Sequence, residues 1–165
     1  MGLTQIATHV QSRVNHKHSG LPTGWQRDRF RQLCATYATI SGCSSECVRT
    51  LEIIIDFINP QHFTDTHKEP LCFARQENIV AGRSITEKTI FNHERQLEAI
   101  GLIERRLAAN GSRCKRKGLG LVLSPAINAI NLMMQALEDV SQVTAYRDEL
   151  RGKRSFLMRQ IRQTL

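Results

Sequence analysis

The chain has 165 residues, enough for one folded domain with an appended element but hardly for two full domains. Its apolar content of 41% predicts a folded protein, and its formal net charge of +8 favours a polyanionic partner, nucleic acid before an anionic membrane. The longest apolar run, residues 51–58, contains two acidic residues and is too short to cross a bilayer.

The five cysteines are an odd number spread along the chain, which is typical of reduced thiols in a cytoplasmic protein. Cys34, Cys43 and Cys47 lack the paired short chelate loops of structural zinc sites. We therefore expect no metal and no other cofactor, and we interpret the thiols as small buried apolar groups. The N-terminal residues show no secretory signal.

Residues 1–24 are polar and rich in histidine, and we expect a flexible arm whose histidines are solvated. A helix is predicted over residues 25–40, ended by Ser41-Gly42. A second helix, capped by Ser44 or Ser45, stops before Pro60. The apolar stripes of both helices are typical of core scaffold.

A polar connection over residues 61–70 leads to a short strand at 71–73 and a short helix at 74–81, which Gly82 closes. The next four residues, Ser84-Ile85-Thr86-Glu87, fit a capping box in which Ser84 is the N-cap. The helix that they open ends at Gly101 and carries four inward residues: Ile90, His93, Leu97 and Ile100. This order of elements predicts a helix-turn-helix, with His93 as a core histidine.

A β-hairpin is predicted directly after that helix. Residues 102–106 form its first strand, Ala109-Asn110-Gly111 its turn, and residues 119–123 complete the return. A hairpin in this position is a wing. The predicted fold is therefore mostly α: a winged helix-turn-helix with a small β-hairpin wing and a C-terminal helical extension.

The extension starts at Ser124, expected as the cap, and Pro125, expected at the first helical position. Its apolar stripe is irregular after residue 137, and Gly152 is expected to weaken or bend it. We expect either a homodimer through this helix or packing of the helix on the chain's own first helix; the apolar residues concerned are Ile127, Ile130, Met134 and Leu137. The predicted organisation is an arm (1–24), a winged-helix domain (25–124) and the extension (125–165).

Two groups of polar residues are candidates for DNA contact. Opposite the apolar face of the capped helix, or on its flank, lie the expected base-reading residues: Lys88, Thr89, Asn92 and Arg95. Arginine can pair with guanine, and asparagine with adenine. The wing has six basic and no acidic residues between positions 105 and 117, which favours contact with the DNA backbone through Arg105, Arg106, Arg113, Lys115, Arg116 and Lys117.

The run TIFNHERQLEAIGLIERRLAANGSRCKRKGLGLVLSP, residues 89–125, resembles the N-terminal region of RepC, the replication initiator of repABC plasmids. The shared features are a histidine like His93, the phrase L-x-x-x-G-L-I-x-R at 97–105, N-G-x-R at 110–113 and L-S-P at 123–125. Glu94 departs from the pattern, which usually has an apolar residue there. The resemblance implies a winged-helix protein that binds double-stranded DNA at a plasmid replication origin, without catalysis.

Two alternatives use the same fold. One is a transcriptional regulator, because the same DNA-reading module serves both roles. The other is a protein-interaction module whose working surface is the C-terminal helix. A hydrolytic enzyme is the most distant option, since the sequence has no phosphate-binding glycine loop, no H-E-x-x-H and no serine elbow.

Overall fold

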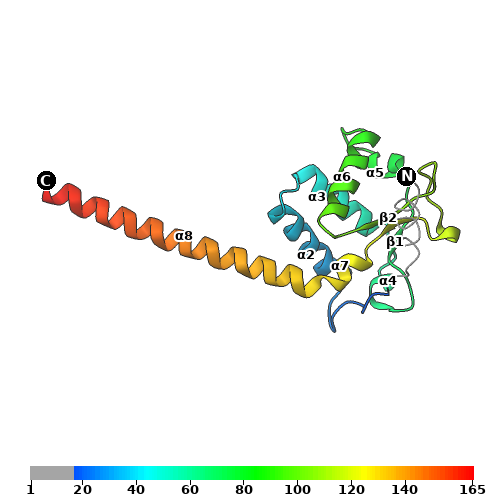
Figure 1. Cartoon of the computed structure of the whole chain (residues 1–165), viewed down its shortest axis with the longest axis horizontal. Coiled ribbons are helices and arrows are strands. Elements are labelled where there is room, and N and C mark those ends of the chain that lie inside the picture. Colours follow the sequence, from blue (N-terminus) through cyan, green and yellow to red (C-terminus); the bar gives the residue numbers. More distant parts are fainter. Residues whose placement is uncertain (1–16) are drawn as a thin grey trace, which may run out of the picture.

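A computed structural model describes residues 17–165 and shows a winged-helix body from which one long helix projects (Figure 1). The elements in chain order are α2 (Arg27–Ile40), α3 (Ser45–Asp56), α4 (Gln61–Thr64), β1 (Leu71–Cys72), α5 (Gln76–Val80), α6 (Glu87–Ala99), β2 (Glu104–Arg106), the 3-10 turn η1 (Lys115–Lys117), β3 (Gly120–Val122), α7 (Ser124–Asn128) and α8 (Ile130–Thr164). The predicted fold class is confirmed.

The core lies where α2, α3 and α6 meet the small sheet. Each helix contributes an apolar stripe with no exposed surface, including Phe30 of α2, Leu51 of α3 and Leu97 of α6. Burying one such side chain contributes about 1.5–3 kcal/mol, so these stripes hold the helices together. Of the two serines considered as the cap of α3, the structure selects Ser44, whose side chain accepts a hydrogen bond from the Cys47 amide at 3.2 Å.

The sheet is antiparallel, with β3 between β1 and β2. Leu71 pairs with Val122 and Arg105 pairs with Leu121, so the strand expected after the polar connection and the wing hairpin are both confirmed. Glycine is required at position 120, where β3 lies beside β1, because a Cβ atom there would lie 2.3 Å from the Cys72 carbonyl oxygen.

The wing differs in part from a simple hairpin. The turn expected at Asn110-Gly111 is present: the Gly111 amide donates to the Ala108 carbonyl at 2.8 Å, and Gly111 has φ +75°. The return is not continuous strand, because the 3-10 turn η1 is inserted between the bridge partners Cys114 and Leu119. This turn places three consecutive basic residues at one point of the wing.

Two expected helix caps are wrong. Thr86, not Ser84, caps α6: its hydroxyl accepts from the Thr89 amide at 3.2 Å, and the helix begins at Glu87. Ser84 belongs to the preceding turn, where Ile85 packs against the core. Ser124 is the first residue of α7 rather than its cap, and its hydroxyl is buried without a hydrogen-bond partner.

The segment before α2 is bound to the body, so the flexible arm is a wrong prediction for residues 17–24. His18 is only 4% exposed, and its Nε2 lies 2.7 Å from the Lys68 carbonyl oxygen. The Leu21 amide donates to the Phe63 carbonyl of α4, a helix within the expected polar connection. Residues 1–16, the rest of the predicted arm, lie outside the described residues.

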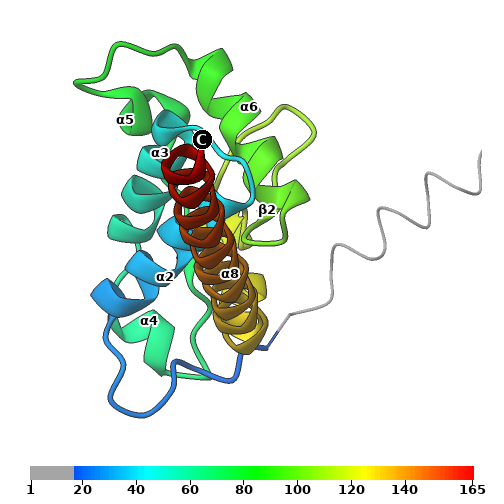
Figure 2. The same cartoon turned by 90° about the vertical axis from the view of Figure 1, so that its left-hand side faces the viewer.

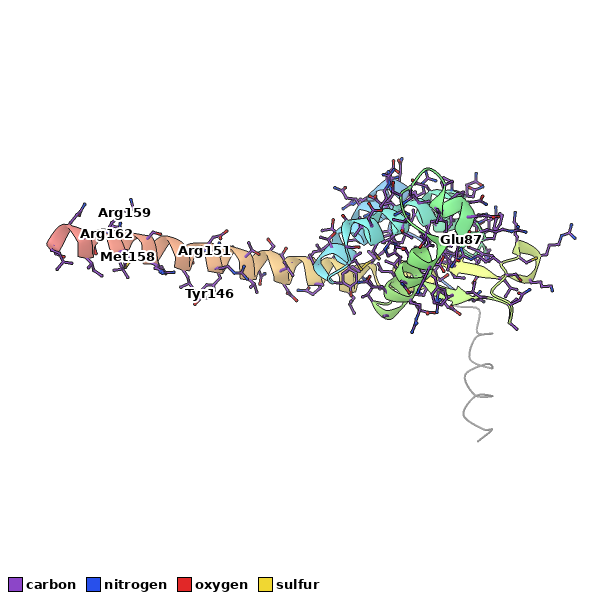
Figure 3. All side chains as sticks on the ribbon, turned by 90° about the horizontal axis from the view of Figure 1, so that it is seen from above. Glu87, Tyr146, Arg151, Met158, Arg159 and Arg162 are labelled. Carbon is purple, nitrogen blue, oxygen red and sulfur yellow. The ribbon has the colours of Figure 1, made fainter. Side chains whose placement is uncertain are left out.

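The helix α8 is one uninterrupted element of 35 residues, and it continues through Gly152 (Figures 1 and 2). Its start packs on α2, and Ile130 and Met133 are its only buried residues. The predicted packing of the extension on the chain's first helix is therefore correct for Ile130. Ile127 of α7 is buried as well. From residue 138 onward α8 is exposed, and labelled residues such as Tyr146 and Met158 lie on the part of the helix that extends beyond the body (Figure 3).

None of the helices described, α8 included, has the length and hydropathy needed to cross a membrane.

Candidate nucleic-acid interface

The helix α6 turns one face to the core and the other to solvent. Ile90 and Leu97 are fully buried, and between them His93 is 8% exposed. Lys88, Asn92 and Arg95, which sequence reasoning placed opposite this face, are all exposed. Residues three and four apart share a helix face, so these three side chains form one outward row. In Figure 2, α6 lies at the outside of the body beside α5.

Thr89 differs from the other predicted base-reading residues. It is half-buried, and its hydroxyl lies 3.1 Å from the hydroxyl of the capping residue Thr86. The Thr89 side chain therefore takes part in the hydrogen bonds that begin the helix. Its predicted contact with a base stays a prediction, as do those of Lys88, Asn92 and Arg95.

His93 is the core histidine that its helical position predicted. Its Nδ1 lies 2.8 Å from the Thr50 hydroxyl of α3, and Arg83 donates a hydrogen bond to that hydroxyl at 2.9 Å. Burial lowers the pKa of His93, and the positive charge of Arg83 lowers it further, while Glu46 raises it. The neutral imidazole therefore anchors α6 to α3.

Glu94 lies next to His93 on the same inward face and has no exposed side-chain surface. It forms an ion pair with Arg113 of the wing, whose side chain is 3% exposed. Arg113 also donates to the Ala74 carbonyl at 2.5 Å, just before α5. A buried carboxylate needs such a partner, because an isolated charge in the interior is strongly unfavourable. The pair joins α6 to the wing.

Sequence reasoning missed Glu94 as a structural residue, although the signal was present. Position 94 is four residues after Ile90 and three before Leu97, which places it on the inward stripe. A carboxylate at such a position predicts a buried cation from elsewhere in the chain.

Two further wing arginines also pair with carboxylates of the protein. Arg105 donates from Nε to Glu98 at 2.9 Å, and its side chain is 18% exposed. Arg106 pairs with Glu104 at 3.0 Å and with Glu69, and its side chain is 10% exposed. Burial alone would lower the pKa of Arg106, but its hydrogen bonds and the two negative charges outweigh burial and raise it.

The predicted contacts of Arg106 and Arg113 with the DNA backbone stay predictions, but in the structure both guanidinium groups are held by carboxylates of the protein. Moving either guanidinium to a phosphate would break an ion pair with a buried or half-buried carboxylate. Arg105 keeps a small exposed surface next to α6. The exposed cations of the wing are the three residues of η1: Lys115, Arg116 and Lys117.

The family model of the replication protein C N-terminal domain matches residues 3–165 of this chain. The chain belongs to the replication protein C family. This confirms the resemblance to RepC and indicates a role in plasmid replication. No curated protein and no solved structure matches the chain.

Four of the five cysteines of this replication protein C domain, Cys34, Cys43, Cys47 and Cys72, are buried as predicted, whereas Cys114 of the wing is half-buried. Burial raises the pKa of the Cys72 thiol to about 11 and, together with neighbouring Cys43, raises that of Cys47 to about 12. Cys34 has no exposed surface, and burial raises its pKa as well. Such thiols are neutral at physiological pH and act as small apolar groups. Within residues 17–165, no three His, Cys, Asp or Glu side chains are grouped so that they could hold a metal ion.

Proposed function

We propose that this replication protein C domain binds double-stranded DNA sequence-specifically at a plasmid replication origin, without catalysis. The observation that carries the proposal is the exposed row of Lys88, Asn92 and Arg95 on a helix whose opposite face is locked into the core. A helix held in this way can enter the major groove without losing its position, which base recognition requires.

Within this proposal, Arg95 and Asn92 read bases, because each side chain can make paired hydrogen bonds to one base edge. Lys88, nearer the start of α6, contacts a base or a phosphate, and Thr89 supports the same end of the helix. The exposed cations of η1, Lys115 to Lys117, bind phosphates beside the groove. Arg106 and Arg113 set the position of the wing from inside the protein.

The test is selection of bound sequences from random duplex DNA, followed by location of the preferred sequence on the source replicon. A preferred site within a replication origin supports the proposal. A site over a promoter supports the transcriptional regulator instead. Failure to enrich any sequence contradicts specific DNA binding and favours a protein-interaction module.

We further propose that two copies pair through the exposed part of α8. Val143, Leu150 and Leu157 are spaced by seven residues and are 60%, 46% and 56% exposed. Val140 and Ile161 flank them at heptad spacing, so one narrow seam runs along the helix, apolar except at Arg147 and Arg154. This seam lies beyond the residues predicted from sequence, because the start of the extension is used in the chain's own core.

The charges along α8 favour an antiparallel pair. Residues 138–149 contain four acidic residues and one basic residue, whereas residues 151–165 contain five basic residues and no acidic one. Antiparallel pairing places the acidic segment of one copy beside the basic segment of the other. Parallel pairing would place Arg147 and Arg154, both on the seam at heptad spacing, against their own copies.

Sedimentation at micromolar concentration tests the pairing, and Leu150→Lys should abolish it without unfolding the body. Cross-linking tests the direction. In an antiparallel pair, copies carrying Val143→Cys form disulfides with copies carrying Leu157→Cys more readily than with themselves. The unmodified chain is the control for its native cysteines. A chain that stays monomeric, with and without DNA, contradicts the pairing.

A further inference from the structure

An aromatic residue occupies the middle of the outward face of α6. Phe91 is 39% exposed and is three residues after Lys88 and four before Arg95. It therefore shares the face that the proposed function assigns to base reading. The base-reading residues predicted from sequence do not include Phe91.

Two guanidinium groups lie beside the Phe91 ring. The Cζ atom of Arg105 is 5.2 Å from the ring centroid, and that of Arg95 is 5.9 Å away. Both distances lie within the range of cation–π attraction. Arg105 is itself fixed, because Glu98 accepts hydrogen bonds from its backbone amide at 3.1 Å and from its Nε at 2.9 Å. The ring is thus an apolar patch held in place within a positively charged surface.

The chemistry of the surroundings identifies what this patch contacts. An apolar protein surface laid on Phe91 would also cover the exposed cation of Arg95 and remove it from water, which is unfavourable without a counter-charge. DNA supplies the counter-charge and the hydrogen-bond acceptors together with an apolar group. The apolar group on base edges in the major groove is the C5-methyl of thymine.

We infer that the Phe91 ring contacts the C5-methyl of a thymine next to the base that Arg95 reads. This inference rests on the proposed function and adds to it a requirement for a methyl group at one position of the site. Phe91 is then a specificity-determining residue, and Arg105 positions it.

The test uses the duplex selected by the protein, with each thymine replaced in turn by deoxyuridine, which lacks only the methyl group. At one position the unmodified protein should lose about 4-fold in affinity, which is the change in affinity expected when one buried methyl group is removed. The Phe91→Ala variant should bind more weakly overall but show no further loss at that position. The Gln96→Ala variant, altered at another exposed position of α6, should keep the full loss.

Phe91→Leu separates the contact from any effect on folding, because it keeps an apolar side chain and should keep part of the methyl dependence. Thermal melting of each variant shows that the fold is retained. The inference is overturned if deoxyuridine has no effect at any position, or if Phe91→Ala loses as much as the unmodified protein. A protein that binds specific duplexes without methyl dependence overturns only this inference, whereas one that binds no duplex overturns the proposed function as well.

Discussion

Glu94 of α6 and Arg113 of the wing form a buried ion pair, and each is the other's charge partner. The two residues come from elements that must be held in a set geometry if they are to contact one DNA duplex together. Arg113 extends the link to the start of α5 through the Ala74 carbonyl. The pair therefore positions α6 and the wing relative to each other.

Removing one member of this pair should be strongly destabilising. Glu94→Ala leaves the Arg113 guanidinium buried without its carboxylate, and we expect a loss of about 3–5 kcal/mol in the free energy of unfolding. The double variant Glu94→Leu with Arg113→Met removes both charges and should recover most of that loss. Urea unfolding measures all three proteins. If the single and double variants lose equal stability, the pair is not coupled.

Because Thr86 and not Ser84 caps α6, substitutions of these two hydroxyl residues should change the stability of the protein by different amounts. Thr86→Ala should lower the free energy of unfolding by about 1 kcal/mol, because the Thr89 amide loses its acceptor. Ser84→Ala is the matched control and should change stability by less than about 0.5 kcal/mol, the usual range for a surface position. Thermal denaturation measures both variants. A larger loss of stability in Ser84→Ala than in Thr86→Ala would instead support the capping box expected from sequence.

The lowered pKa of His93 predicts a loss of stability in acid. The folded protein favours the neutral imidazole, whereas the unfolded chain binds the proton with a pKa of about 6.5. The contribution of His93 is therefore complete above that pH and falls as the pH drops from it toward the folded pKa.

Urea midpoints between pH 7.5 and 5.5 measure the effect. His93→Gln should reduce the pH dependence, whereas His67→Gln, altered at an exposed histidine, should leave it unchanged. An identical slope in the unmodified protein and in His93→Gln would assign the acid sensitivity to another group.

The basic residues of the wing fall into two groups, exposed and largely buried, and substitutions in the two groups should have different effects. Replacing Lys115, Arg116 and Lys117 by Ala should weaken binding to all duplexes alike and lower the salt slope by about one for each lost phosphate contact. The fold should be unaffected, because these side chains are exposed. Arg106→Ala should instead lower the melting temperature, since it removes a largely buried guanidinium that pairs with both Glu69 and Glu104. An unchanged salt slope in the triple variant would show that η1 does not lie on DNA.

Substitutions in the outward row of α6 should reduce affinity mainly for the preferred DNA sequence. Arg95→Ala should reduce affinity for the selected duplex about 10-fold or more, because a paired contact to guanine discriminates by roughly 1–3 kcal/mol. Affinity for a scrambled duplex at the same salt concentration should change far less, and Asn92→Ala should behave in the same way. Equal losses on both duplexes would mean that this face only positions the protein.

Much of the fold was predictable from local sequence, because helices and turns depend on residues close together in the chain. The inward stripe of α6, the turn at Asn110-Gly111 and the strand at residue 71 are all where the sequence places them. Periodicity also assigned Lys88, Asn92 and Arg95 to the outward face, since the two faces of a helix follow from its repeat alone.

The tertiary structure decided which charges are available. In sequence, Arg113 and Lys115 belong to one basic run, yet Arg113 is buried against Glu94, 19 residues away, and Lys115 is exposed. Arg106 likewise pairs with Glu69, 37 residues away. A charged side chain is free to bind DNA only if no carboxylate of the folded protein already holds it. The sequence determined the number of cations and their order, but contacts between distant segments determined which of them face solvent.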